Sequence, residues 1–289
     1  MKKIKYLGVF LFIALILTTG CFKWDNLEGI EIVTTVYPLE YVTNYLYGEH
    51  SIVNSVYPDG TDTSSYSLSK KQISDYSKKK LFIYNRITDD KDIAIEFLDK
   101  NQKMLIIDAT YGMEITYGEE ELWLNPSNLL MMTQNIKNGL KEYMTNSYLE
   151  KEIDKKYEEI KVSLSELDAE IKLTAANATR KTSVVNSNSL KFLEKYGFEV
   201  ISLDGSVSNV SDKTISEVEN KINNKEVKHI FLLENKENSS AVNKVIEDTK
   251  VSTYTFRKLD NITDNDRDDK NNYFTIMNDN IDLLKDELY

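Results

Sequence analysis

Short apolar runs alternate with amphipathic segments along most of this chain. Runs rich in Val, Ile and aromatic residues, bounded by turn residues, predict strands at 31–37, 51–57, 81–84, 104–107, 182–185, 198–203, 229–233 and 251–256. In the first half, helical segments are expected between the strands, near 38–48, 69–79 and 90–100. The second half repeats this alternation and closes with a helix. Strands that alternate with helices indicate a mainly parallel sheet with helices on its faces.

A long amphipathic segment separates the two halves. Its apolar side chains recur at spacings of three and four on a Lys- and Glu-rich background: Leu149, Ile153, Tyr157, Ile160, Leu164, Leu167 and Ile171. No Gly or Pro interrupts 147–176, which predicts a rod of about 45 Å. A coiled coil is the alternative, but a single short stripe between two αβ halves favours an intramolecular helix. The predicted fold is α/β, with an N-terminal lobe at 30–146, a linking helix at 147–177 and a C-terminal lobe at 178–289.

The first 20 residues have the layout of a bacterial secretory signal. Three lysines precede an apolar run over 6–17, and small residues stand directly before Cys21. The run is too short to span a bilayer core of about 30 Å. We therefore expect a signal peptide at 1–20, a lipidated Cys21, a tether over 21–29, and a protein anchored to the outer face of the bacterial cell membrane. An ordinary signal peptide with an incidental cysteine is the alternative.

Composition excludes several classes of function. Cys21 is the only cysteine, so the chain has neither a disulfide framework nor a thiolate metal cluster. The formal net charge is −11, and loss of the three signal lysines makes it −14, which disfavours nucleic-acid binding. We find no nucleophile elbow, no glycine-rich phosphate loop and no His paired with Ser or Cys, so an enzyme is not expected.

Several short motifs occur in order along the chain. They are VTTVYP at 33–38, YPDGTD at 57–62 with Tyr66, LFIYN at 81–85, IDA at 107–109, WLNP at 123–126, FLEKYG at 192–197 and YFTIM at 273–277 with Asn280. In these motifs and their spacing, the chain resembles the solute-binding lipoproteins of zinc- and manganese-type ABC importers. The resemblance implies a monomeric receptor that captures a divalent cation between two lobes and delivers it to an ABC permease and ATPase.

The resemblance also implies four metal-ligand positions, filled in the family by histidines and carboxylates, with one pair from each lobe. Matched residue by residue, these positions fall on Ser64, Glu121, Asn186 and, in a loop of different length, Lys258. A Ser hydroxyl and an Asn carbonyl are weak ligands for Zn²⁺, and a lysine ammonium repels a cation. The metal site is therefore expected to be degenerate.

Two hypotheses for this site stay open. In the first, the receptor still holds a divalent cation, either zinc, manganese or a harder ion, through Glu121, Asn186, water and a nearby acid such as Asp260. In the second, which we favour, Lys258 stands where the cation stood and pairs with Glu121, because an unpaired buried charge is costly. A surface interaction protein, with the fold kept as a scaffold, is the alternative from another functional class.

Three other polar features are expected to be structural. His50 lies in a turn and His229 begins an apolar strand, so neither is expected to bind metal. The acidic segment 264–268 imitates a calcium loop, but Asp269 occupies the glycine position and Thr275 the place of the closing glutamate. We expect this segment to be a solvated turn.

Overall fold

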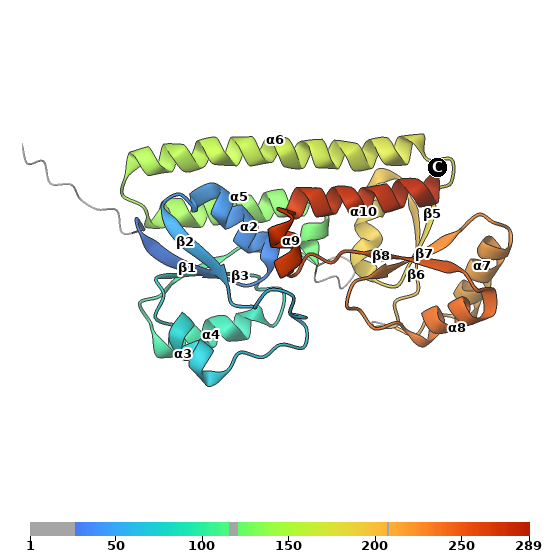
Figure 1. Ribbon diagram of the computed structural model, residues 1–289, viewed down its shortest axis with the longest axis horizontal. Helices are drawn as coiled ribbons and strands as arrows, with labels where there is room; N and C mark the ends of the chain where they lie inside the picture. Colours follow the sequence, from blue (N-terminus) through green and yellow to red (C-terminus); the bar gives the residue numbers. More distant parts are fainter. Residues whose placement is uncertain (1–26, 116–120, 207) are drawn as a thin grey trace, which may run out of the picture.

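Two four-stranded parallel sheets form the framework of the protein. The computed structural model describes residues 27–115, 121–206 and 208–289 (Figure 1). The first sheet has the order β2-β1-β3-β4, from β1 (Ile30–Thr34), β2 (Ser51–Ser55), β3 (Leu81–Tyr84) and β4 (Leu105–Asp108). The second has the order β6-β5-β7-β8, from β5 (Thr182–Val185), β6 (Glu199–Ser202), β7 (His229–Leu233) and β8 (Ser252–Phe256). The predicted α/β class is confirmed.

Helices cover both faces of the first sheet. One face carries α3 (Lys70–Tyr76) and α4 (Asp90–Lys100), and the other carries α2 (Tyr37–Tyr47) and α5 (Pro126–Tyr143) (Figure 1). The sequence pattern did not indicate α5. This helix begins at Pro126, and the side chain of the preceding residue, Asn125, caps it by accepting a hydrogen bond from the Ser127 amide.

In the C-terminal lobe, α7 (Asp212–Asn223) and α8 (Ser240–Thr249) pack together on one side of the second sheet (Figure 1). The 3-10 segments η1 (Leu122–Leu124) and η2 (Asn188–Tyr196) contact each other at the junction of the lobes. The two lobes therefore touch through short helical turns as well as through the linking helix.

The long helix α6 (Ser147–Asn177) runs along both lobes and confirms the predicted linking helix (Figure 1). All seven apolar positions of its predicted stripe are buried. This stripe packs against α5 and against α10 (Tyr273–Leu288), which lies beside α6 on the same side of the molecule (Figure 1). The buried stripe makes α6 a rigid support for the two sheets.

The chain returns to the N-terminal lobe after β8. The amide of Tyr37 donates to the carbonyl of Asp260 at 2.9 Å, and the amide of Gly60 donates to the carbonyl of Ile262 at 2.7 Å. Residues 257–272 belong to the C-terminal half of the sequence but pack against the loops that follow β1 and β2 in the N-terminal lobe. We refer to them as the return segment. This return segment closes one side of the space between the lobes.

The acidic segment 264–268 is helical where the sequence indicated a solvated turn, but all of its residues except Asp266 are exposed as expected. It forms the short helix α9 (Asp264–Asp268), which Thr263 and Asp266 begin with a capping box. Asp266 is 6% exposed, and its carboxylate forms an ion pair with Arg257 at 2.9 Å. The prediction was wrong for Asp266, which can be buried because the Arg257 guanidinium compensates for its charge.

The chain is already packed at Leu27, which is fully buried in the hydrophobic core and falls within the predicted tether at 21–29. The predicted signal peptide at 1–20 and Cys21 lie outside the described residues. Within the part of the chain that the structure describes, no helix is both long and apolar enough to cross a membrane.

Candidate functional site

A small cavity lies between the carboxyl ends of the first sheet and the return segment 257–272. Its volume is about 160 Å³. The lining residues are Val36, Tyr57, Thr63, Ser64, Thr88, Asp89, Asp90, Glu121, Trp123, Lys258 and Asp260. Ligand sites of parallel α/β sheets occur at this edge, where successive crossovers leave the sheet in opposite directions. We refer to this space as the interlobe cavity.

Lys258 supplies a cation inside the interlobe cavity. Its Nζ atom lies 3.4 Å from Glu121 Oε1 and 3.2 Å from Asp260 Oδ2. The side chains of Lys258 and Glu121 are each 11% exposed, and that of Asp260 is 4% exposed. Burial works to lower the pKa of Lys258, but the carboxylates of Asp260 and Glu121 outweigh burial and hold that pKa above its ordinary value. Lys258 is therefore charged at neutral pH.

Hydroxyl groups from both lobes hold the two carboxylates in place. Ser189, at the start of η2, donates a hydrogen bond to Glu121, and Thr63, in the loop after β2, donates one to Asp260. Neither hydroxyl was identified from the sequence, because isolated Ser and Thr residues carry no motif. Each carboxylate therefore has a hydrogen-bond donor in addition to the lysine.

The backbone that carries Lys258 is also fixed. Trp123 Nε1–H donates to the carbonyl oxygen of Lys258 at 2.8 Å, and Tyr273 O–H donates to the carbonyl oxygen of Trp123 at 2.6 Å. Trp123 and Tyr273 are both buried. The lysine thus belongs to a connected network that joins η1, α10 and the return segment.

Asp90, at the first turn of α4, also lines the interlobe cavity. Tyr57 O–H donates to Asp90 Oδ1 at 2.8 Å. Asp90 is 5% exposed, and burial raises the pKa of its carboxyl group. The same burial raises the pKa of Tyr57, so the phenol keeps its proton and its role as a donor.

Two of the predicted ligand positions differ in their placement. Ser64 lines the interlobe cavity, but its hydroxyl donates to Asp62 Oδ1 at 2.7 Å. Asn186 lies apart, within the C-terminal lobe: its Oδ1 accepts the Leu233 amide at 2.7 Å, and its Nδ2 donates to Asn238 Oδ1 at 3.0 Å. The structure therefore brings Ser64, Glu121 and Lys258 together around the cavity and leaves Asn186 outside it.

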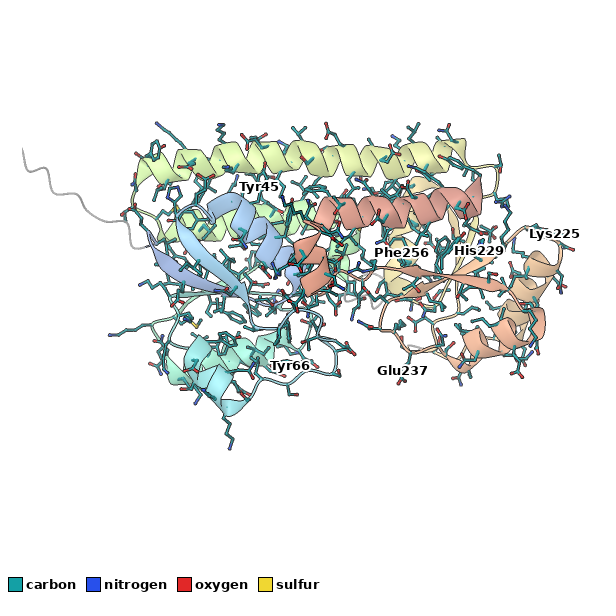
Figure 2. All side chains as sticks on the ribbon, in the orientation of Figure 1. Tyr45, Tyr66, Lys225, His229, Glu237 and Phe256 are labelled. Carbon is teal, nitrogen blue, oxygen red and sulfur yellow. The ribbon has the colours of Figure 1, made fainter. Side chains whose placement is uncertain are left out.

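The donor set of the interlobe cavity does not fit a zinc or manganese ion. Across residues 27–115, 121–206 and 208–289, no group of three or more His, Cys, Asp or Glu side chains is arranged to hold a metal. His50 Nε2 instead contacts Glu152 at 3.1 Å, and His229, at the start of β7 (Figure 2), has its Nδ1 atom 2.8 Å from Glu287. Both histidines have structural partners.

Comparison with known proteins identifies the family. Residues 32–287 match the family model described as zinc-uptake complex component A, periplasmic, or ZnuA. The chain belongs to the ZnuA family. This finding confirms the resemblance drawn from the sequence motifs.

Similar proteins are found in several bacteria. The chain is 23% identical over 295 residues to the zinc-binding protein AdcA of Streptococcus pyogenes serotype M3, covering 89% of this chain and 56% of AdcA. It is 22% identical over 287 residues to the high-affinity zinc uptake system protein ZnuA of Bacillus subtilis, covering 90% and 88%. The chain thus spans about half the length of the AdcA relatives.

Solved structures of similar proteins share the fold. The metal-dependent lipoprotein YcdH of Bacillus subtilis superimposes with a TM-score of 0.74 at 20% identity, covering 90% of this chain and 99% of YcdH. The Zn(II)-bound ZnuA-like domain of Streptococcus pneumoniae AdcA gives a TM-score of 0.72 at 21% identity, covering 90% and 99%.

Proposed function

We propose that this ZnuA-family protein is an extracytoplasmic solute-binding lipoprotein of a zinc- or manganese-type ABC importer, in which a lysine ammonium has replaced the metal ion. Membership in the family and the two-lobed fold support the receptor role. The contact of Lys258 with both Glu121 and Asp260 supports the replacement of the metal ion by an ammonium group. The ammonium is a cation that the chain itself supplies.

The charges in the interlobe cavity support replacement of the metal. A divalent cation could enter the interlobe cavity by two routes. It would either lie beside the Lys258 ammonium or push that ammonium away from its carboxylates, although Trp123 holds the Lys258 backbone in place by a hydrogen bond. Both routes are unfavourable, because the first adds repulsion between cations and the second breaks a paired buried charge. The neutral oxygen of Ser64 offers little compensation, since Zn²⁺ prefers imidazole, thiolate and carboxylate ligands.

The receptor role implies partners and a location. Under this proposal the protein works as a monomer with an ABC permease and ATPase, and performs no chemistry of its own. The relatives named for zinc uptake and the similar structure named as a lipoprotein support this assignment. Lipidated Cys21 would hold the protein on the outer face of the cell membrane.

Metal titration tests the replaced site directly. The purified protein would be treated with chelator, and its thermal unfolding would then be followed with Zn²⁺, Mn²⁺, Mg²⁺ and Ca²⁺. A ligand at 100 times its dissociation constant stabilises a protein by about 2.7 kcal/mol, which raises the melting temperature measurably. We expect no saturable rise with any of these ions. A saturable rise that Glu121→Ala abolishes would refute the ammonium replacement.

Fractionation tests the membrane anchor separately. The full-length chain and its Cys21→Ser variant would be expressed in a Gram-positive host, and the membrane and culture medium compared. We expect the natural chain in the membrane fraction and the variant in the medium. Equal distribution of the two would refute lipidation at Cys21 and leave the result of the metal titration unaffected.

A further inference from the structure

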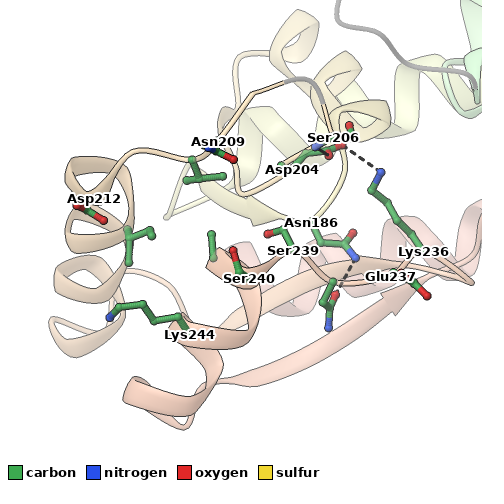
Figure 3. A pocket seen from close by; sticks show the side chains of 15 residues that line it. Asn186, Asp204, Ser206, Asn209, Asp212, Lys236, Glu237, Ser239, Ser240 and Lys244 are labelled. Carbon is green, nitrogen blue, oxygen red and sulfur yellow. Dashed lines mark hydrogen bonds and ion pairs between the residues drawn. The ribbon is translucent and has the colours of Figure 1, made fainter.

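A second, larger cavity lies wholly within the C-terminal lobe. Its volume is about 690 Å³, within the range of small-molecule pockets and well above the 160 Å³ of the interlobe cavity. Its wall includes Asn186, Asp204, Asn209, Lys236, Ser239 and Ser240 (Figure 3). We refer to it as the C-lobe pocket.

The C-lobe pocket lies at the same position relative to the second sheet as the interlobe cavity does relative to the first sheet. The sheet orders β2-β1-β3-β4 and β6-β5-β7-β8 are equivalent, so β1, β2 and β3 correspond to β5, β6 and β7. Val36 and Tyr57 follow β1 and β2 at the interlobe cavity, whereas Asn186 and Asp204 follow β5 and β6 at the C-lobe pocket. Asp90 at the start of α4 likewise corresponds to Ser240 at the start of α8. Both cavities therefore lie where parallel α/β sheets bind ligands.

A charged pair is built into the wall of the C-lobe pocket. Lys236 Nζ lies 3.2 Å from Asp204 Oδ2, and the Asp204 side chain is 4% exposed (Figure 3). The amides of Asn188 and Ser206 donate to the same carboxylate at 3.0 and 2.9 Å. These bonds fix Asp204 as an anion, while Lys236, which is 29% exposed, retains N–H groups that can reach a ligand.

Polar groups on the rim of this pocket are free to bind. Within the described residues, the side chains of Asn209 and Ser240 form no hydrogen bond, and both are exposed. The amides of Ser240 and Ala241 belong to the first turn of α8, a ten-residue helix, where backbone N–H groups have no carbonyl partner within the helix. The wall of the pocket thus presents donors, in addition to Lys236, that the fold does not use.

The signs of the charges narrow the class of ligand. Asp204, Asp212 and Glu237 bring negative charge to the wall, and Lys236 and Lys244 bring positive charge. A bare anion would meet the acids, a bare cation would meet the lysines, and an apolar molecule would leave polar groups unpaired. No metal-binding cluster is present in the described part of this wall. A ligand that carries both signs fits best.

We propose that the C-lobe pocket binds a small zwitterionic solute of the size of an amino acid or dipeptide, whose carboxylate contacts Lys236 and the first turn of α8. This site extends the receptor role and does not depend on the state of Lys258. Metal titration tests the interlobe cavity, and titration with zwitterions tests the C-lobe pocket, so either proposal can fail alone.

Calorimetric titration of the purified protein tests this site. The probes are the twenty standard amino acids and glycylglycine at pH 7, each binder then being compared with its N-acetyl amide, which lacks both charges. Inorganic phosphate serves as the anion alone. We expect saturable heat with at least one zwitterion, and binding at least tenfold weaker for its N-acetyl amide. Saturable heat with none of the zwitterions, or equal binding of phosphate, overturns the proposal.

Variants then locate the binding. We expect Lys236→Met to weaken binding at least tenfold. Ser240→Ala should weaken it severalfold without affecting folding, because this exposed hydroxyl has no partner in the protein. Ser216→Ala, at an exposed position of α7 outside the pocket wall, is the matched control and should bind as the natural protein does. Binding that survives both Lys236→Met and Ser240→Ala unchanged overturns the assignment to this pocket.

Discussion

Arg267 on α9 and Glu40 on α2 form an ion pair between the return segment and the N-terminal lobe, with Arg267 Nη2 3.0 Å from Glu40 Oε1. The same nitrogen contacts Asp59 Oδ1 at 2.8 Å. Glu40 is 5% exposed, and burial raises its pKa while Arg267 opposes the rise. This pair holds residues 257–272 in place, and with them the loop that carries Lys258.

Replacing Arg267 by alanine is expected to destabilise the protein by about 2 kcal/mol. The cost falls below the 3–5 kcal/mol typical of fully buried pairs, because the Arg267 side chain is 41% exposed. Urea unfolding of Arg267→Ala and of Arg267→Ala with Glu40→Gln measures the effect. The double variant should recover part of the loss, since it removes the buried, unpaired carboxylate. Equal stability of Arg267→Ala and the natural protein would contradict this account.

Asp266 is expected to make stability depend on acid. Burial alone would raise the pKa of Asp266, but hydrogen bonds from Arg257 and Thr263 hold it well below its usual value. A lowered folded-state pKa contributes stability above the unfolded value of about 3.9, and this contribution disappears as the pH falls below it. Unfolding free energies of Asp266→Asn and the natural protein should therefore differ at pH 7, and the difference should narrow progressively as the pH falls below about 4. A constant difference across this range would exclude a titration effect.

Local signals account for what could be predicted of the fold. The strands are short runs of β-branched and aromatic residues, and α6 carries an uninterrupted apolar stripe. Each of these elements can therefore be predicted from its own residues alone. Helix α5 does not, because its sequence mixes Asn, Gln and Gly139 among the apolar residues. The burial of Asp266 was missed for a related reason: its partner Arg257 lies outside α9, just after β8, and the sequence pattern does not show that the two side chains meet.

In the candidate site too, some features could be predicted from the sequence and others depend on how the chain packs. Alignment with the family placed Glu121 and Lys258 at corresponding ligand positions, and the structure brings their charged atoms to 3.4 Å. That this contact replaces a metal stays a prediction. The placement of Asn186 could not be foreseen, because its hydrogen bonds to Leu233 and Asn238 depend on how β7 and the following loop pack.

Gly139 is expected to resist substitution by alanine. A Cβ atom at this position of α5 would lie 2.7 Å from Ile107 Cγ1 and 2.8 Å from its Cδ1. Overpacking costs about 1–3 kcal/mol, and alanine returns about 1 kcal/mol through its helix propensity, so we expect a net loss of up to about 2 kcal/mol. Denaturant unfolding of Gly139→Ala, alone and in the Ile107→Ala background, checks the cause, because Ile107→Ala removes the Cγ1, Cγ2 and Cδ1 atoms that the new Cβ would meet. If Gly139→Ala costs as much in that background as in the natural protein, the clash is not the reason.

Lys258→Met is expected to have the largest effect of these substitutions. Methionine keeps much of the length and apolar volume of the lysine but leaves the carboxylates of Glu121 and Asp260 facing each other without a cation. Removing one partner of a buried pair costs about 3–5 kcal/mol. We expect a loss of about 3 kcal/mol at pH 7, measured by urea unfolding.

The same variant asks whether the ammonium has taken the place of a metal ion. Without Lys258, two carboxylates and the Thr63 hydroxyl border a cavity to which water can contribute further oxygen ligands, a set that suits a hard cation. Ca²⁺ or Mg²⁺ should therefore stabilise Lys258→Met but not the natural protein. Adding Glu121→Gln should abolish that response, since it removes one of the two anions. If Lys258→Met is as stable as the natural protein and does not respond to these ions, the lysine does not stand in for a metal ion. The two carboxylates would then be stable without a neighbouring cation.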